Sequence, residues 1–169
     1  KYFKAIEDTI RQDFTQDTGT DARLRDQILS TESVCLNVRR GDFVTNPVAS
    51  RFHGVCDEEY FRRALDTMKK YIDRPTLFIF SDDIPWCREN LEFQDPTVFV
   101  TPEYYGKKYE KKFRLMTMCR HFIIPNSTFG WWAAWLADAP EKQVVAPRKW
   151  FADPGLNTDD LIPGTWIRI

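Results

Sequence analysis

The chain has 169 residues, 43% of them hydrophobic and 29% charged, which is enough for one globular domain with a hydrophobic core. Its net charge of -1 gives no reason to expect a nucleic acid as partner. No apolar run is long enough to cross a membrane. Four cysteines stand singly and far apart beside only two histidines, so zinc-site spacing is absent and reduced thiols are expected.

The first elements are predicted from hydrophobic spacing. Apolar residues recur every four positions near the amino terminus and predict an amphipathic helix, at Ile6, Ile10 and Phe14. The polar stretch over 16–25 is typical of a loop or of the start of a helix. Residues 34–38 carry alternating apolar side chains, which predicts the first strand.

The segment after this strand contains Pro47 and Gly54, and we expect a long loop that could cover a site. Asp57 is placed to cap a helix over 58–72, which has apolar residues along one side. Residues 76–80 (TLFIF) are almost all apolar. Such a run is typical of a strand that is buried on both faces of a parallel sheet.

The rest of the chain continues to alternate between predicted helices and strands. Helices are expected over 86–91, 110–120 and 128–138, and strands over 97–100, 122–124 and 143–146. The tail, rich in proline and tryptophan, indicates an irregular packed segment. The alternation predicts one α/β domain over 1–169, with a doubly wound, mostly parallel sheet of five strands.

Three of the six tryptophans lie close together in the helix that begins near residue 128. They are Trp131, Trp132 and Trp135. A bulky buried helix would account for them, and so would an interface with another domain. The sequence leaves both interpretations open.

Polar residues follow three of the predicted strands, at 39–43, 81–83 and 126–130. Because the carboxyl ends of parallel strands meet at one edge of a sheet, we expect these segments to converge on a ligand site. The third segment opens a helix, whose free N–H groups and dipole favour an anion, and Ser127 and Thr128 add hydroxyl groups. Plain helix capping by these hydroxyls is the alternative, and it is compatible with phosphate binding.

Two adjacent arginines, Arg39 and Arg40, can bind phosphate oxygens through bidentate hydrogen bonds. The alternative is a salt bridge with Asp42 or another carboxylate, an interpretation that fits Arg40 better than Arg39. The pair Asp82–Asp83 is more typical of a helix cap than of a metal site. No P-loop and no dinucleotide-binding fingerprint occurs.

Three segments together resemble the α-1,2-fucosyltransferase family of inverting glycosyltransferases. They are 34–43 (VCLNVRRGDF), 80–90 (FSDDIPWCREN) and 115–136 (LMTMCRHFIIPNSTFGWWAAWL). The resemblance implies a GT-B fold and transfer of fucose from GDP-fucose to a galactose-containing glycan, forming an α-1,2 linkage with inversion. It also implies that this chain is the Rossmann-like, carboxy-terminal donor-binding half, against which an amino-terminal acceptor-side domain, absent here, would pack. A cytoplasmic location is expected, peripheral at the inner membrane in a bacterium.

The same resemblance implies roles for the site residues. Arg39 would hold the donor pyrophosphate with Arg40 assisting or buttressing it, and these two are the expected catalytic residues. They would stabilise the charge on the leaving GDP with no metal and no other cofactor. Ser127, Thr128 and Phe129 would lie against the diphosphate. The other expected donor-binding residues are Asn37, Asp42, Ser81 and Asp82. The base that would help the acceptor hydroxyl is not located.

The chain departs from the family pattern at two positions. Asn37 stands where the family usually has histidine, and Lys112 stands where it usually has an acidic residue. In related fucosyltransferases these positions help to recognise guanine, and a lysine cannot accept the N–H donors of guanine. A related transferase that uses another nucleotide sugar is therefore one alternative. A non-catalytic nucleotide-sugar-binding module is the other.

Overall fold

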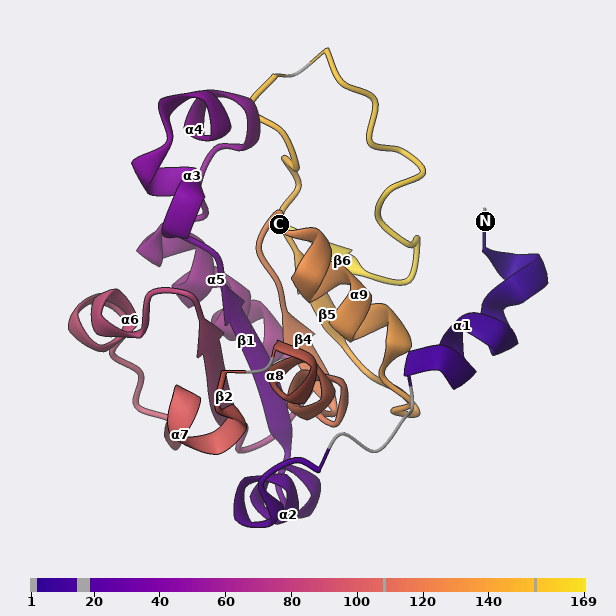
Figure 1. The fold of residues 1–169 in the computed structure, drawn as a ribbon. Coiled ribbons are helices and arrows are strands. Elements are labelled where there is room, and N and C mark those ends of the chain that lie inside the picture. The colour runs from indigo at the N-terminus through magenta and orange to yellow at the C-terminus, as the bar shows by residue number, and fades with distance from the viewer. Residues whose placement is uncertain (1–2, 15–18, 108, 154) are drawn as a thin grey trace.

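Six parallel strands form a single sheet in the order β3-β2-β1-β4-β5-β6 (Figure 1). The computed structural model describes residues 3–14, 19–107, 109–153 and 155–169. The strands are β1 (Ser33–Val38), β2 (Thr76–Ser81), β3 (Thr97–Val100), β4 (His121–Ile123), β5 (Val144–Ala146) and β6 (Ile167–Arg168). The strand order reverses between β1 and β4, as in a Rossmann-like doubly wound fold. The predicted α/β class is therefore confirmed.

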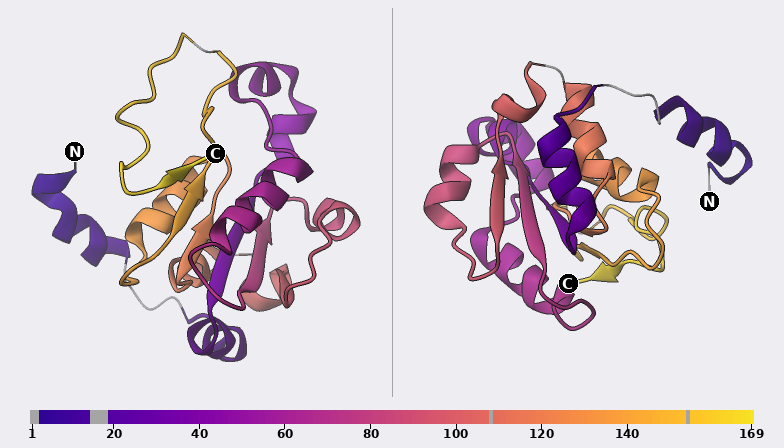
Figure 2. Two further views of the ribbon diagram at one scale, coloured as in Figure 1. Left: turned by 180° about the vertical axis from the view of Figure 1, so that it is seen from behind. Right: turned by 90° about the horizontal axis from the view of Figure 1, so that it is seen from below.

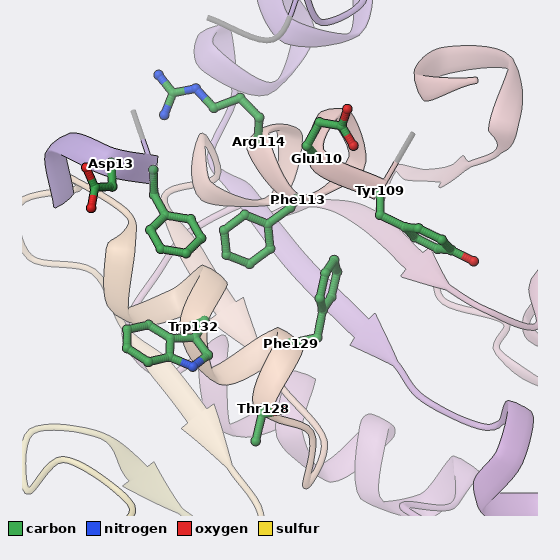
Figure 3. Close-up of a pocket in the computed structure, with 9 residues that line it drawn as sticks. Asp13, Tyr109, Glu110, Phe113, Arg114, Thr128, Phe129 and Trp132 are labelled. Carbon is green, nitrogen blue, oxygen red and sulfur yellow. The ribbon is translucent and has the colours of Figure 1, made fainter. Parts of the chain in front are cut away.

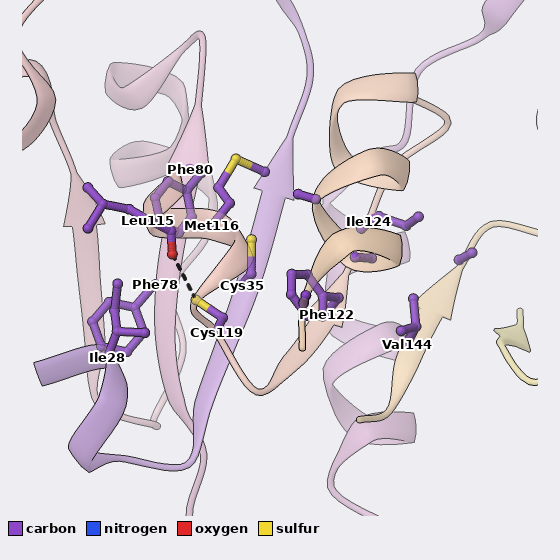
Figure 4. Packing of buried hydrophobic residues seen from close by; sticks show 14 of the residues in the cluster. Ile28, Cys35, Phe78, Phe80, Leu115, Met116, Cys119, Phe122, Ile124 and Val144 are labelled. Carbon is purple, nitrogen blue, oxygen red and sulfur yellow. Dashed lines mark hydrogen bonds between the residues drawn. The ribbon is translucent and has the colours of Figure 1, made fainter. Parts of the chain in front are cut away.

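Helices cover both faces of the sheet (Figure 2). One face carries α2 (Ala22–Ser30), α8 (Tyr109–Thr117) and α9 (Thr128–Leu136), and the other carries α5 (Glu58–Met68) and α6 (Ile84–Asn90). Side chains of β1 and β2 alternate between the two cores. Phe78 and Phe80 pack on the α8 side (Figure 4), and Leu77 and Ile79 pack on the α5 side. Both strands are buried on both faces, as the almost wholly apolar sequence predicts for β2.

Two parts of the fold differ from the sequence prediction. The expected long loop after β1 consists of two short helices, α3 (Gly41–Thr45) and α4 (Pro47–His53). Pro47 starts α4 instead of interrupting a helix, because a proline at the first helical position loses no intrahelical hydrogen bond. The tail adds a sixth strand, β6, which pairs with β5 where only irregular chain was expected.

The other elements lie close to their predicted positions. Asp57 and Asp83 cap α5 and α6 through hydrogen bonds that their side chains accept from the backbone N–H groups of Tyr60 and Trp86. Asp21 likewise caps α2, so the ambiguous polar stretch contains a helix start. The remaining helices are a 3-10 turn over Lys4–Ile6, α1 (Glu7–Phe14) and α7 (Pro102–Tyr105). No described helix is both long and apolar enough to span a bilayer.

The tryptophan helix α9 is held at its carboxyl end by two basic side chains. Arg11 of α1 donates to the carbonyls of Trp135 and Leu136 at 3.2 and 3.1 Å, and its guanidinium lies 4.6 Å from the Trp135 ring. Lys142 donates to the carbonyl of Ala137. Burial lowers the pKa of Lys142 to about 8. These cations satisfy the last carbonyls of the helix and complement its dipole. The tryptophans are half-buried, and α1 and the tail cover part of them.

Gly130, in the first turn of α9, allows the amino end of this helix to pack closely against β1. The side chain of Asn37 in β1 donates to the carbonyl of Phe80 at 3.1 Å, and its Oδ1 is buried without a hydrogen-bond partner. A Cβ atom on Gly130 would lie 2.6 Å from this oxygen and 3.3 Å from Ile124. Gly130 therefore allows the first turn of α9 to approach the end of β1.

We expect Gly130→Ala to destabilise the domain by about 1–3 kcal/mol, since the new methyl group must displace Asn37 or overpack Ile124. In a helix with free space beside the glycine, the same substitution would raise the free energy of unfolding by about 1 kcal/mol. The sign of the change therefore shows whether Gly130 is tightly packed. Urea denaturation monitored by tryptophan fluorescence measures the change. Gly164→Ala is the control, because nothing lies within 4 Å of a Cβ placed there. A variant at Gly130 as stable as the wild-type chain would show that the contact is loose.

Candidate functional site

A cavity of about 640 Å³ lies at the carboxyl edge of the sheet, beside the point where the strand order reverses. It is bordered by the end of β1, the residue after β2, α8, the start of α9 and the tail. The three polar segments expected to converge do so here. The cavity-lining residues among the predicted ones are Asn37, Arg39, Asp82, Ser127, Thr128 and Phe129.

Arg39 is held by two carboxylates. Its Nη1 donates to Asp82 Oδ2 at 2.8 Å and its Nη2 to Asp42 Oδ1 at 2.6 Å, and its Cζ lies 5.6 Å from the Phe43 ring centroid. The side chain remains 38% exposed. The salt-bridge interpretation of Arg39 is therefore confirmed. It does not exclude a ligand, because a guanidinium has five N–H donors and this one lines the cavity.

Arg40 points toward α6 and does not line the cavity. Its Cζ lies 3.7 Å from the Trp86 ring centroid and its Nε 3.6 Å from Asp83 Oδ2. Its backbone N–H donates to Asp82 Oδ1 at 2.9 Å. Of the two roles expected for Arg40, assisting or buttressing Arg39, this geometry favours the second, because Arg40 and Arg39 share Asp82.

Asp42 and Ser81 also lie outside the cavity lining. Asp42 pairs with Arg39 from the first turn of α3. Ser81 is buried at the end of β2, and its Oγ accepts a hydrogen bond from the backbone N–H of Asp83 at 2.9 Å. Both residues act on the site through the neighbours that they hold. Within the described part of the chain, no group of three or more histidine, cysteine, aspartate or glutamate residues could hold a metal ion.

The first turn of α9 is open toward the cavity. Ser127 is the residue before the helix, and its hydroxyl makes no capping hydrogen bond. The capping interpretation of Ser127 is therefore wrong, and its hydroxyl lines the cavity with Thr128 and Phe129. Asn126 fixes this turn because its Nδ2 donates to the carbonyls of His53 and Trp150 at 2.7 and 3.1 Å. An uncapped helix start with fixed N–H groups is a site for an anion.

Several lining residues were not predicted from the sequence. His53 stacks on Phe43 with ring centroids 4.5 Å apart, and its Nδ1 is buried without a partner. The tail contributes Trp150, Phe151 and Leu161 to the cavity wall. These residues come from segments expected to be irregular. Two general signals were present in the sequence, the loop after the first strand that could cover a site and the cluster of aromatic residues in the tail, and neither identified these residues individually.

Lys112 of α8 also lines the cavity, although it is only 6% exposed. Its Nζ donates to the carbonyl of Ser81 at 2.7 Å. Burial lowers the pKa of Lys112, and the nearby charge of Asp82 opposes this shift. Lys112, one of the two positions at which the chain departs from the family pattern, therefore lines the candidate site.

A second, aromatic cavity of about 570 Å³ adjoins the first and shares Tyr109, Thr128 and Phe129 with it. Phe113 and Phe129 pack edge to face at 5.1 Å, and Phe14 of α1 lies 5.8 Å from Phe113 (Figure 3). This wall is apolar and suits a flat or hydrophobic group.

The thiols have no visible part in the site. The four cysteines are free, and burial raises the pKa of Cys56 to about 12 and that of Cys87 to about 11. Both thiols therefore stay protonated near neutral pH and are poor nucleophiles. Cys56 instead donates to Asn126 Oδ1 at 3.5 Å and helps to hold the turn before α9.

Comparison with known proteins shows one matching family model and several similar proteins. The family model described as Glycosyl transferase family 11 matches residues 1–169. The chain is 35% identical to an alpha-1,2-colitosyltransferase of Escherichia coli, over all of this chain and 59% of that protein. It is 37% identical to the O-antigen biosynthesis glycosyltransferase WbnK of Escherichia coli, over 83% of this chain and 45% of the relative. It is 34% identical to human galactoside alpha-(1,2)-fucosyltransferase 1, over 62% of this chain and 28% of the relative.

No solved structure matches the chain. The chain spans less than two thirds of the length of each of these relatives, so it corresponds to one part of their structure. The match of the family model over the full sequence, together with 35% identity to the colitosyltransferase along the whole chain, shows that the chain belongs to glycosyl transferase family 11.

Proposed function

We propose that this chain is the donor-binding half of a glycosyltransferase that moves fucose from GDP-fucose to a galactose-containing glycan, forming an α-1,2 linkage. One observation carries the proposal: Arg39, oriented by Asp42 and Asp82, shares a cavity with the uncapped start of α9. A guanidinium and a helix amino terminus are complementary to a diphosphate. The names of the relatives support transfer of a deoxysugar to form an α-1,2 linkage.

The geometry supports a mechanism without a metal ion. Breaking the bond between sugar and phosphate leaves negative charge on the diphosphate. Arg39 and the N–H groups at the start of α9 stabilise this charge, and their positions are fixed before the ligand arrives. The acceptor hydroxyl oxygen attacks the anomeric carbon from the face opposite the leaving phosphate, so the configuration of the sugar inverts. The new C–O bond replaces the bond to phosphate, and the hydroxyl proton passes to a base or to the solvent.

The acceptor would bind to a second domain that faces the carboxyl edge of the sheet. Supporting this, α3 and α4 lie beyond that edge (Figure 1) and expose apolar side chains. Val44, Val48 and Phe52 are 50%, 77% and 46% exposed. The relatives contain sequence outside the matched region that could form such a domain. In a bacterium we would place the whole enzyme in the cytoplasm, at the inner membrane.

A transferase for another nucleotide sugar is the second candidate, and the buried ammonium of Lys112 favours it. A positive charge in the cavity cannot accept the N–H donors of guanine.

Arg39→Ala should weaken binding of GDP by about 1.5–3 kcal/mol, or roughly tenfold to 150-fold, because a hydrogen bond to a charged phosphate is lost. Arg39→Lys keeps the charge but loses the planar fork, so its affinity should be intermediate. Isothermal titration calorimetry measures both. Arg23→Ala is the matched control, since Arg23 is exposed on α2 and does not line the cavity. Unchanged affinity for GDP in Arg39→Ala would remove Arg39 from the donor site.

Binding of GDP should be independent of divalent metal ions, because positively charged protein groups take the place of a cation in this cavity. The same titration in EDTA, in magnesium and in manganese should give affinities within about twofold of one another. Binding that appears only with magnesium or manganese would contradict the proposed mechanism.

A further inference from the structure

Lys112 is a buried ammonium with an incomplete set of partners. It is only 6% exposed, and its Nζ lies 5.6 Å from the Tyr105 ring centroid. Among the described residues its one hydrogen bond, to the carbonyl of Ser81, uses one of its three N–H donors. Among the described residues, no carboxylate lies within 4.0 Å of its Nζ. A buried lysine is normally paired with an opposite charge, so the native environment lacks one partner.

The acidic residue of the cavity cannot supply this partner. Asp82 is the one carboxylate among the described residues that line it. Both of its oxygens are already bonded, Oδ2 to Arg39 and Oδ1 to the backbone N–H of Arg40. Burial lowers the pKa of Lys112, the nearby charge of Asp82 opposes this shift, and the charge of Arg39 has a smaller lowering effect. Lys112 and Arg39 are thus two cations that line one cavity, and neither oxygen of Asp82 is bonded to Lys112.

A ligand with two or more negative charges would resolve this arrangement. Lys112, Arg39 and the uncapped start of α9 line the same space. A diphosphate offers enough oxygen atoms to accept from all three groups, and its charge would attract both cations.

The cavity is poorly equipped to read a guanine base. Guanine presents adjacent N–H donors, for which a free carboxylate is the matching acceptor. The Asp82 oxygens are occupied, and Asn37 Oδ1 is buried against Gly130, where no ligand atom reaches it in this conformation. The aromatic wall formed by Tyr109, Phe113 and Phe129 would contact any flat base in the same way. Two carboxylates also line this adjoining cavity: Glu110 already has another partner, and Asp13 is exposed to water, which competes for the N–H groups of a base.

We propose that Lys112 binds the diphosphate of the donor opposite Arg39, and that the chain selects nucleoside diphosphates through their phosphates with little discrimination between bases. The inference rests on the proposed donor site. It adds a residue to that site and widens the class of donor from guanine nucleotides to nucleoside diphosphate sugars in general.

The test is calorimetric titration of the chain with GDP, UDP, ADP and inorganic pyrophosphate at constant ionic strength. For the wild-type chain, the three nucleotides should bind within about tenfold of one another. Lys112→Met, which keeps the length and apolar stem of the side chain, should weaken all four ligands by a similar factor of about ten or more. Lys112→Arg should retain most of the affinity. Lys111→Met is the control, since its neighbour Lys111 does not line the cavity.

The other possible results contradict either the proposed role of Lys112 or the proposed donor site. If Lys112→Met weakens GDP but leaves pyrophosphate unchanged, Lys112 contacts the base and the proposal is overturned. A wild-type preference for GDP of about a hundredfold or more also overturns it. If the Lys112 variants bind all four ligands as the wild-type chain does, Lys112 does not bind the diphosphate and the proposal is overturned. The proposed donor site would still be tested separately by Arg39→Ala. Failure of the wild-type chain to bind any of the four ligands would instead refute the proposed function. Urea denaturation confirms folding, and if Lys112→Met does not fold, Lys112→Gln replaces it.

Discussion

The Asp82 carboxylate joins the end of β2 to the residues that follow β1, and the geometry of the site depends on this junction. One oxygen accepts from the backbone of Arg40 and the other from the side chain of Arg39. Gly41 makes the approach possible, because a Cβ atom there would lie 2.6 Å from Asp82 Oδ2. Gly41, Asp42 and Asp82 therefore act together to orient the guanidinium of Arg39. Because Arg39 is ordered in the folded protein, a ligand would lose less side-chain entropy on binding it.

The second half of the site depends on how α9 is held. Arg11 and Lys142 satisfy the carbonyls at its carboxyl end, and Gly130 seats its first turn against Asn37. Its amino end has no side-chain cap. A helix with cations at one end and open N–H groups at the other keeps its dipole directed toward the cavity. The stability of α9 thus comes from packing and from its carboxyl end, which leaves its amino end free for an anion.

The sequence was sufficient to predict features that depend on local patterns. Alternation of apolar strands with amphipathic helices predicts five of the six strands, and Asp57 and Asp83 identify two helix starts. Features that depend on distant contacts were not predictable. The two-residue strand β6 exists through its pairing with β5, and the direction of Arg40 is set by Trp86 of α6. The helices after β1 were missed because Pro47 has opposite meanings inside a helix and at its first position.

The charge of the cavity connects the family chemistry with the departures of this chain. Its described lining contains the cations Arg39 and Lys112, and Arg39 is already paired with Asp82 and Asp42. The buried ammonium of Lys112 has no bonded carboxylate, which costs stability in the empty domain, and an anionic ligand would relieve this cost. In the proposed site, Arg39 and the start of α9 would hold the leaving phosphate, and the aromatic wall would contact the base. The resemblance to related fucosyltransferases assigns base recognition to the position of Lys112, so a change of charge there would leave Arg39 and the start of α9 in place. By this proposal, Lys112 strengthens binding of the donor phosphates and weakens selectivity for the base. The α/β framework that orients Arg39 stays the same.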